Sequence, residues 1–502
     1  MLALNQSQGG TAIGASPPLE YDFVSRVGLG VVSVDAVDAF ITGTTKQALS
    51  QWFGAEAEGL AIETLRLRLD RAIAEIDAAL SNAVDAIIAH PRFCAFEAGW
   101  RGVAWLTQGL GPDGMTRIRL FDCRWAELAR DLERAPEFDR SVLFTRIYED
   151  EFGTPGGVPF SMIVSLHEVR HKPGPGYPTD DITALRHLSA VAAAAFTPIV
   201  LSAAPALLGA EIHGDLDLRQ SLAPLFRHLE YSRLHALQRH PDTRFLGVVA
   251  PRILIRAPYT HASVPDIGFT YTSRAGPLWA GGAFAVAHIA IRAFNDHRWP
   301  AAITGTVRDE IAGGLVTGLP EVSFATDRQG VALKPPLELN LSDALDRELT
   351  EAGLIGIRHV RGTPWAAIYS LPSLYQPTAS YALDAANANE RMGAVLNYIL
   401  CVSRFAHYIK IIGRDLIGSS GDAEDVEARL QRWLNRFTSA GDRLSIDMQA
   451  RYPLQEARIR VRDVVDRPGA LECSVALKPH FQIDQAVSEF RLVTVVAEAQ
   501  TQ

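Results

Sequence analysis

The chain is poor in cysteine and has no long uninterrupted apolar run. Its 502 residues include four cysteines, and no two of them form a CxxC pair: Cys94, Cys123, Cys401 and Cys473. This spacing argues against a zinc ribbon and against a disulfide framework, so we expect buried thiols. No stretch reaches the roughly 18 apolar residues needed to span a bilayer. The N-terminal residues lack a basic segment followed by an apolar one, which argues against a secretory signal. We therefore expect a cytoplasmic protein without membrane insertion.

The composition is that of a globular chain with an acidic balance. Hydrophobic residues make up 48% and charged residues 21%, and the net charge is −9. The length favours about two to four domains. An acidic chain is a poor non-specific partner for nucleic acid, so we expect none. No arrangement typical of nucleophilic or acid–base catalysis stands out, since the Gly418–Gly421 run is not G-x-S-x-G. We expect no enzyme activity, no catalytic residue, no metal and no cofactor.

One motif offers a competing hypothesis, a zinc-dependent hydrolase. Residues 167–171 read HEVRH, and zinc hydrolases use HExxH with both histidines on one turn of a helix. The preceding residues 162–164 are typical of a β-strand, in which positions four apart are separated by more than about 12 Å. The Pro-Gly-Pro-Gly run at 173–176 excludes a helix directly afterwards. The pattern therefore favours a strand end that leads into a loop.

Two N-terminal segments have helical periodicity. Residues 34–53 predict one broken or two short amphipathic helices after a Gly- and Ser-rich arm. Residues 65–89 carry apolar side chains three and four apart, as in a coiled-coil seam: Leu69, Ile73, Ile76, Leu80, Ala83 and Ile87. Pro91 ends this helix, because the residue before a proline is disfavoured in the helical region.

Residues 386–418 predict one long helix with two different faces. Its apolar face is expected in a core, and its basic face carries Arg404, His407, Lys410 and Arg414. Charge alone leaves that basic face open as a solvated surface or as a site for phosphate, acidic protein or nucleic acid.

Further elements follow from the same patterns. We expect a strand at 117–121, a helix at 180–195 capped by Asp181, and a strand at 198–203. Residues 353–357 and 366–369 are expected as strands of one sheet. A helix at 426–437 and strands at 454–465 and 490–496 complete the chain. A terminal strand offers unpaired backbone groups to a neighbouring subunit.

Several blocks resemble one known family, the large subunit of the type VI secretion contractile sheath (TssC, VipB-like). They are HPRFCAFEAGWRGVAWL at 90–106, FDRSVLFTRIYEDEFGTPGGVPF at 138–160, SRFAHYIKIIGRDLIG at 403–418 and LKPHFQI at 477–483. The matching residues include Trp100, Arg101, Glu151, Phe152, Gly153, Gly156, Gly157, Pro479, His480 and Phe481. The first 60 residues are not covered.

The resemblance implies a structural subunit with a mixed α/β sheath fold, in which a mixed sheet is flanked by helices. It implies an arm at 1–60, a body at 61–380 and an assembly module at 381–502. The implied partners are the small sheath subunit TssB, other copies of the chain, the inner tube, the baseplate and the AAA+ ATPase ClpV. Contraction of the sheath would drive effector delivery. The predicted subunit-interface residues are Arg404, His407, Lys410, Arg414, Phe490, Leu492, Val493 and Val495.

Overall fold

The structure is a computed structural model that describes residues 2–4, 42–53, 59–154, 156–259, 271, 276–307, 310–324, 333–377, 384–416, 423–439, 441, 445–463, 471–480 and 490–497. The chain forms two compact units. One comprises Met1–Ser7, Ala95–Arg256 and Trp279–Gln502, and the other Gln8–Cys94 and Ala257–Leu278.

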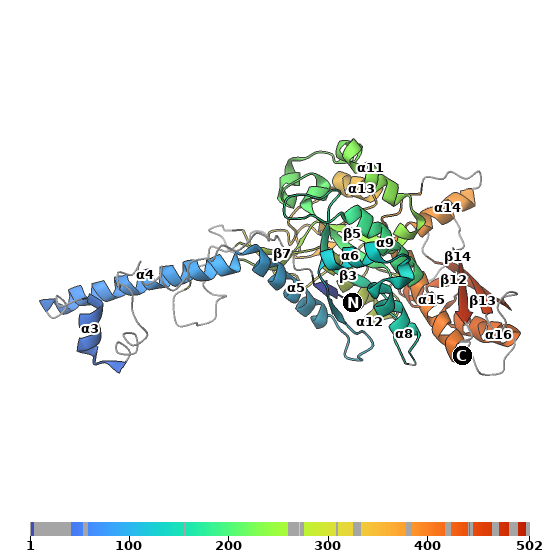
Figure 1. The fold of residues 1–502 in the computed structure, drawn as a ribbon, viewed down its shortest axis with the longest axis horizontal. Helices are drawn as coiled ribbons and strands as arrows, with labels where there is room; N and C mark the ends of the chain where they lie inside the picture. Colours follow the sequence, from blue (N-terminus) through green and yellow to red (C-terminus); the bar gives the residue numbers. More distant parts are fainter. Residues whose placement is uncertain are drawn as a thin grey trace. The chain divides into compact units, whose positions relative to one another are not determined.

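The first unit is built on a parallel sheet of six strands in the order β2-β1-β3-β4-β5-β9. Two of these strands, β3 and β5, are labelled in Figure 1. Its strands are β1 (Leu2–Leu4), β2 (Leu120–Asp122), β3 (Ile163–Val169), β4 (Ile199–Ala203), β5 (Leu246–Ala250) and β9 (Ile355–Gly356). All residues of β4 and β5 are buried. Near-continuous apolar strands of this kind are typical of a parallel sheet covered on both faces.

Helices cover both faces of this sheet. Alternate residues of β3, β4 and β5 share a core with α9 (Asp181–Ala194) and α6 (Trp125–Arg134). Because successive strand side chains point to opposite faces, Ser202 and Val249 point the other way. The hydroxyl of Ser202 accepts a hydrogen bond from Ala283 N at 3.1 Å, which places the start of α12 (Ala283–His297) on that second face.

Two small sheets accompany the main one. β10 (Arg358–His359), β11 (Ala366–Ala367) and β8 (Leu315–Val316) form an antiparallel sheet, and β6 (Ile253–Arg256) pairs with β7 (Leu278–Ala280). The prediction that 353–357 and 366–369 belong to one sheet is therefore wrong, since β9 joins the main sheet and β11 does not. The mixed α/β class is confirmed, with parallel and antiparallel pairing in separate sheets.

The C-terminal elements form a second core around an antiparallel sheet. β12 (Leu454–Asp463), β13 (Leu471–Pro479) and β14 (Phe490–Ala497) lie in that order, and α15 (Leu396–Leu416) and α16 (Ala423–Leu434) pack against them. Phe405, Ile409, Leu430 and Val475 are all buried in this core. The predicted helix at 426–437 and the predicted terminal strand are confirmed.

The prediction of a single helix at 386–418 is wrong in one respect, because the structure has two helices there, α14 (Asp384–Gly393) and α15. The main chain at the break bonds another segment. Ser373 N donates to Ala394 O, and Leu396 N donates to Leu371 O, both at 2.7 Å. A backbone that pairs with a neighbouring segment cannot complete its helical hydrogen bonds. Gly418, the predicted end of the helix, lies outside the described residues.

The remaining helices are α3 (Thr45–Phe53), α4 (Ile62–Ile88), α5 (Pro91–Gln108), α7 (Val142–Phe144), α8 (Asp150–Phe152), α10 (Ala223–Phe226), α11 (Ser232–Gln238), α13 (Asp343–Glu351) and α17 (Ile446–Arg451). A π-helix, η3, spans Thr145–Glu149. The helix predicted at 65–89 and its end before Pro91 are confirmed.

Within the described ranges, no helix has the length and apolar character to cross a bilayer. Cys401 and Cys473 are buried as expected, whereas Cys94 and Cys123 are half-buried.

Candidate assembly site

The basic face of α15 lies against the chain's own surface. Arg404 donates to Tyr408 OH at 2.7 Å and to Ser161 Oγ at 3.3 Å. Arg414 donates to the carbonyl of Phe152 at 3.1 Å. Both side chains are half-buried, so the interpretation of this face as a solvated surface does not hold for them. Periodicity places residues on one face of a helix, but it does not show what covers that face.

Lys410 is enclosed by aromatic rings from two other segments. Its ammonium donates to Tyr148 OH at 2.9 Å. It also lies 4.7 Å from the ring centroid of Tyr148, 5.6 Å from that of Phe152 and 4.9 Å from that of Phe196. Cations over ring faces are stabilised by the ring quadrupole, more so when water is excluded. Lys410 therefore fastens α15 to the π-helix and to the end of α9.

His407 is 5% exposed, and its Nε2 lies 3.0 Å from the carbonyl oxygen of Ala195. Burial lowers its pKa to about 4, because a charged imidazole would lose its hydration there. A neutral ring donates to the carbonyl through Nε2–H. His407 is thus a structural contact inside the unit.

The family-motif residues at 151–157 build the turn that receives these contacts. Glu151 is buried, pairs with Arg119 and accepts a hydrogen bond from Val158 N at 2.8 Å. Gly156 has a positive φ of 82°, which glycine adopts without strain. A Cβ at Gly157 would lie 2.1 Å from the carbonyl oxygen of Glu151, so no side chain fits there. Gly153 ends α8 directly after Phe152.

The other motif residues lie on α5 and at the end of β13. Arg101 Nε donates to Glu97 at 2.6 Å, and the same carboxylate accepts from the buried Arg256 at 2.9 Å. Trp100 is 43% exposed beside Phe96. His480 follows Pro479, the last residue of β13, and its N donates to Pro453 O at 3.2 Å. Phe481 lies outside the described residues.

The two edges of the C-terminal sheet differ. The outer edge of β12 is covered by side chains of α16. Ile459 N donates to Gln431 at 3.0 Å, and Val461 N donates to Glu427 at 2.8 Å. β14 pairs with β13 through Phe490–Ala497, and no described strand pairs with its other edge. Among the described residues, α16 covers the outer edge of β12 and α15 packs beside β14, which is the last strand of the sheet.

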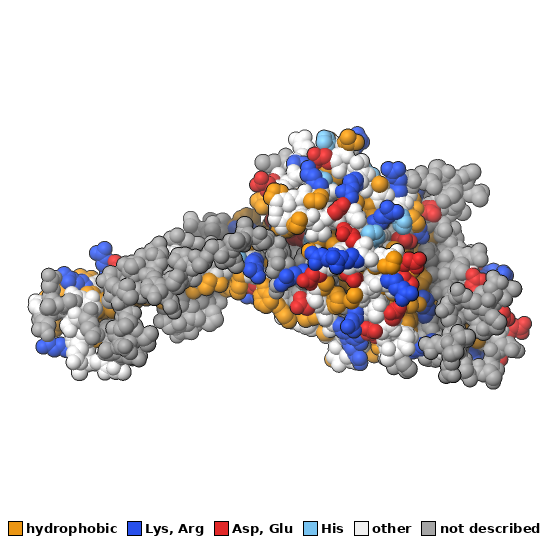
Figure 2. All heavy atoms as spheres, in the orientation of Figure 1, with side chains coloured by type: hydrophobic (Ala, Val, Ile, Leu, Met, Phe, Trp, Pro, Cys, Tyr) orange, Lys and Arg blue, Asp and Glu red, His pale blue; other side chains and the backbone are white. Residues whose placement is uncertain are grey.

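Large apolar side chains are also exposed along α4 in the second unit. They include Ile62, Leu67, Leu69, Ile73 and Ile87. Figure 2 shows hydrophobic side chains along this helix. On the body, by contrast, acidic and basic side chains are interspersed on the face shown.

The HEVRH residues serve the fold. His167 and Glu168 belong to β3, as the sequence predicted, so the two histidines do not share a helical turn. Asp181 accepts hydrogen bonds from Trp125 Nε1 at 2.8 Å and Arg170 N at 2.9 Å, and His167 Nε2 lies 2.9 Å from its carboxylate. Since Asp181 is occupied in this way, the cap of α9 is Asp180, and the prediction of Asp181 as the cap is wrong.

Glu168 pairs with Arg252 through two contacts of 2.6 Å. Its pKa is lowered by Arg252 against the opposing effect of burial. Among the residues that the structure describes, no group of three His, Cys, Asp or Glu side chains is placed to hold a metal ion.

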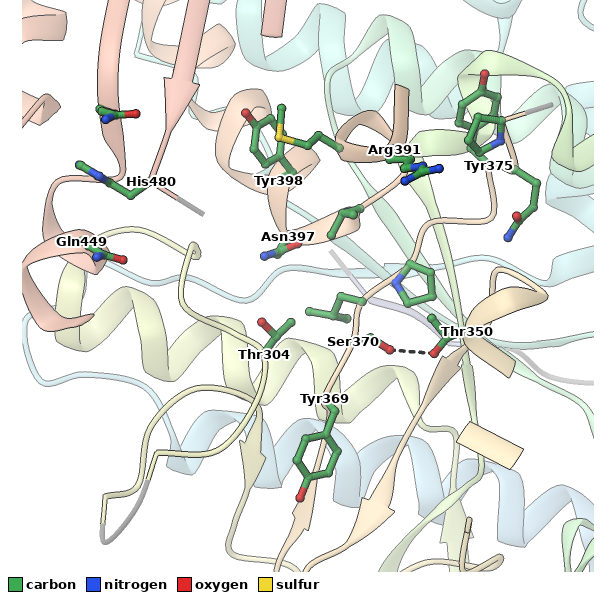
Figure 3. Close-up of a pocket in the computed structure, with 18 of the residues that line it drawn as sticks. Thr304, Thr350, Tyr369, Ser370, Tyr375, Arg391, Asn397, Tyr398, Gln449 and His480 are labelled. Atoms are coloured by element: carbon green, nitrogen blue, oxygen red, sulfur yellow. Dashed lines mark hydrogen bonds between the residues drawn. The ribbon is translucent and has the colours of Figure 1, made fainter. Parts of the chain in front are cut away.

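Sequence reasoning missed a buried polar residue, Asn397, on the first turn of α15. It is 8% exposed and lines a cavity of about 840 Å³ (Figure 3). Asn397 stands in the apolar run Leu396–Leu400, and this position could have identified it from the sequence. An amide buried among apolar side chains normally requires a hydrogen-bond partner, so its presence there calls for an explanation.

Comparisons with known proteins agree with this architecture. Two domain-family models match consecutive stretches, the EvpB/VC_A0108 tail sheath N-terminal domain at residues 70–375 and the EvpB/VC_A0108 tail sheath gpW/gp25-like domain at 385–496. These matches define a tail sheath protein. The chain is 30% identical over 440 residues to the type VI secretion system sheath protein TssC1 of Pseudomonas aeruginosa, with 86% of each chain covered. The chain therefore belongs to the VipB (TssC) family of type VI secretion sheath proteins.

Among solved structures, the helical sheath of the anti-feeding prophage in its contracted state matches with a TM-score of 0.36 and 10% identity. That match covers 80% of this chain and 79% of the other.

Proposed function

We propose that this chain pairs with the small sheath subunit TssB and that the pairs polymerise around an inner tube in the bacterial cytoplasm. Contraction of the polymer drives the tube and its effectors outward from a baseplate. Membership of the sheath family supports this role. This role depends on complementary surfaces between subunits and requires no catalysis.

The observation that carries the proposal is the asymmetric C-terminal sheet. Its β12 edge is covered by Gln431 and Glu427, whereas no described strand pairs with the second edge of β14, beside which α15 packs. A polymer requires each subunit to offer a surface that the next subunit completes. Main-chain pairing along β14 supplies such a surface. We assign Phe490, Leu492, Val493 and Val495 to this contact.

The seam of α4 fits a helix of TssB. Leu69, Ile73, Ile76, Leu80, Ala83 and Ile87 repeat three and four residues apart, as in a two-stranded coiled coil. Leu69, Ile73 and Ile87 are exposed. A partner helix would remove these side chains from water, at roughly 25 cal/mol for each Å² of apolar surface buried.

The predicted interface role of the α15 side chains has less support. Arg404, His407, Lys410 and Arg414 all contact their own chain, so a neighbouring subunit could engage them only after those contacts are exchanged. We propose instead that they hold α15 in place while β14 and α4 make the contacts between subunits.

Electron microscopy after co-expression with TssB tests the proposal. We expect tubes from the wild-type pair. Val493→Pro removes a main-chain donor in β14 and should abolish tubes while a TssB complex persists. Val493→Thr keeps that donor and is the matched control. The absence of both tubes and a stable TssB complex from the wild-type pair would contradict the proposal.

ClpV recognition is a separate proposal for the N-terminal region. Helix α3 (Thr45–Phe53) is amphipathic, and a short amphipathic helix can bind in a groove of a partner. Deleting residues 1–55 should abolish binding of the sheath to ClpV in a pull-down assay. Unchanged binding would exclude this segment.

A further inference from the structure

A second cavity, of about 430 Å³, lies between α12, α15 and the residues that precede β2 and β3. Apolar side chains make up most of its lining. Those that are half-buried or exposed include Met115, Ile118, Val158, Phe160, Ile291 and Ile411. Concave, largely apolar sites of about 300–1,000 Å³ with a few polar groups are typical of small-molecule binding. The size and lining of this cavity therefore fit a small apolar ligand.

The charged side chains around this cavity are all basic. Among the described residues that line it, none is acidic, and Arg117, Arg119 and Arg404 are the cations beside the neutral ring of His407. Arg117 is exposed, and Arg119 already pairs with Glu151. A site lined by one sign of charge favours a ligand of the opposite sign. The cavity therefore favours an anionic group.

Arg404 is a half-buried cation without a carboxylate partner among the described residues. Its guanidinium donates to the neutral hydroxyls of Tyr408 and Ser161, and the bond to Ser161 Oγ is exposed and long, at 3.3 Å. Half-buried Arg252, by contrast, pairs with Glu168 through two contacts of 2.6 Å. Burial disfavours the charge on both side chains, but Glu168 outweighs it and raises the pKa of Arg252, whereas the pKa of Arg404 is lowered. A carboxylate in the cavity would supply the counter-ion that Arg404 lacks.

We propose that this cavity binds a small apolar carboxylate, such as a medium-chain fatty acid. The carboxylate accepts hydrogen bonds from Arg404 in place of Ser161, and the alkyl chain packs against Ile118, Ile291 and Ile411. A hydrogen bond between two charged groups is stronger than one to a neutral hydroxyl, so the exchange at Arg404 is favourable.

An alkyl chain suits this lining better than a polypeptide segment does. Main-chain N–H and C=O groups that leave water require hydrogen-bond partners. The polar side chains near Arg404 are already engaged, since Tyr408 OH accepts from Arg404 and His407 contacts the carbonyl oxygen of Ala195. An alkyl chain brings no polar groups, and its removal from water is itself favourable.

Isothermal titration calorimetry with decanoate tests the inference. The sample is the full chain, purified through an affinity tag after co-expression with TssB, and no tubes are needed. We expect saturable binding of one decanoate per large subunit below the concentration at which decanoate forms micelles. Decanamide has the same alkyl chain without the charge and should bind about tenfold more weakly. TssB alone is the control and should bind neither compound.

The Arg404→Gln variant separates the charge from the packing. It should lower decanoate affinity about tenfold or more and leave decanamide affinity within about twofold, because a loss of packing would affect both compounds alike. Met115→Asp places a negative charge at an exposed position of the lining and should also weaken decanoate more than decanamide. Met448→Asp introduces the same charge on α17, outside this lining, and is the matched control, which should leave both affinities unchanged.

A decanoate analogue with a diazirine at the end of its chain locates the site. After irradiation and digestion, labelled peptides should contain residues 114–119, 158–162 or 287–294 of the lining. Labels confined to other peptides, equal affinity for decanoate and decanamide, or no saturable binding would each overturn the inference. A crosslink to TssB from p-benzoylphenylalanine at Met115 would assign the cavity to a protein segment and would overturn it as well.

Discussion

The basic face of α15 and the apolar seam of α4 reverse the usual relation between polarity and exposure. Arg404, His407 and Lys410 carry polar or charged groups, yet they are buried or half-buried. Leu69 and Ile73 are apolar and exposed. On α15 the chain supplies its own partners, carbonyl oxygens and aromatic rings, for the polar groups. On α4 the apolar side chains are exposed, and large exposed apolar surfaces are typical of interaction sites.

The largest expected effect comes from a charge placed in the α4 seam. Ile73→Asp should weaken TssB binding by about 100-fold or more, because a buried, unpaired carboxylate costs several kcal/mol. Isothermal titration calorimetry measures this change. Ala74→Asp introduces the same charge one position away, outside the seam, and should leave affinity within about threefold. Equal losses in the two variants would mean that α4 does not bind through this seam.

A smaller effect is expected on α15. Lys410→Met removes the hydrogen bond to Tyr148 and the contacts with three rings, and should lower the free energy of unfolding by about 1–3 kcal/mol. Chemical denaturation measures it. Lys172→Met is the matched control, since that exposed lysine pairs with Glu230 at the surface and should contribute less than about 1 kcal/mol. A Lys410 variant as stable as the wild type would show that the ring contacts add nothing.

The buried His407 makes stability depend on pH. Its folded pKa is about 4, below the ordinary value of 6.5, so an unfolded chain binds a proton between these values that the folded chain does not. Stability due to His407 is therefore complete above about pH 6.5 and is lost as pH falls toward 4, by about 1.4 kcal/mol per pH unit.

His407→Gln should reduce the slope of stability against pH by that amount in urea titrations at pH 5 and 6. His288, whose pKa burial also lowers to about 4, stays in both proteins. Identical slopes of stability against pH in the wild type and the variant would mean that the His407 side chain is exposed to water in the folded chain.

The smallest effect is expected from metal removal. EDTA should leave the melting temperature unchanged, and elemental analysis should find no stoichiometric zinc. His167→Ala should still destabilise the fold, because Asp181 loses the imidazole beside its buried carboxylate. Stoichiometric zinc that disappears in this variant would restore the hydrolase hypothesis.

Local patterns predicted local structure well. The period of α4, the stop at Pro91 and the strand predicted from residues 162–164 depend on neighbours in sequence, and all three are confirmed. The break before α15 depends on hydrogen bonds to residues 371–373, and the role of Asp181 depends on Trp125 and His167. Such partners are distant in sequence, so periodicity and capping rules could not reveal them.

In the candidate site, too, the sequence predicted the features that depend on neighbouring residues and missed those that depend on distant partners. The family motifs indicated Glu151, Gly156 and Gly157, whose backbone constraints are local. They could not show that the basic face of α15 packs onto that same turn. The cavity at Asn397 was equally hidden, because its walls come from stretches that lie far apart in the sequence.

The exposed apolar side chains of α4 have a consequence for gene dosage. If this seam binds TssB as proposed, a cell that makes the chain in excess over TssB would accumulate molecules whose apolar seams contact only one another, a known route to aggregation. We expect balanced synthesis of the two subunits, and inclusion bodies whenever the large subunit is made alone.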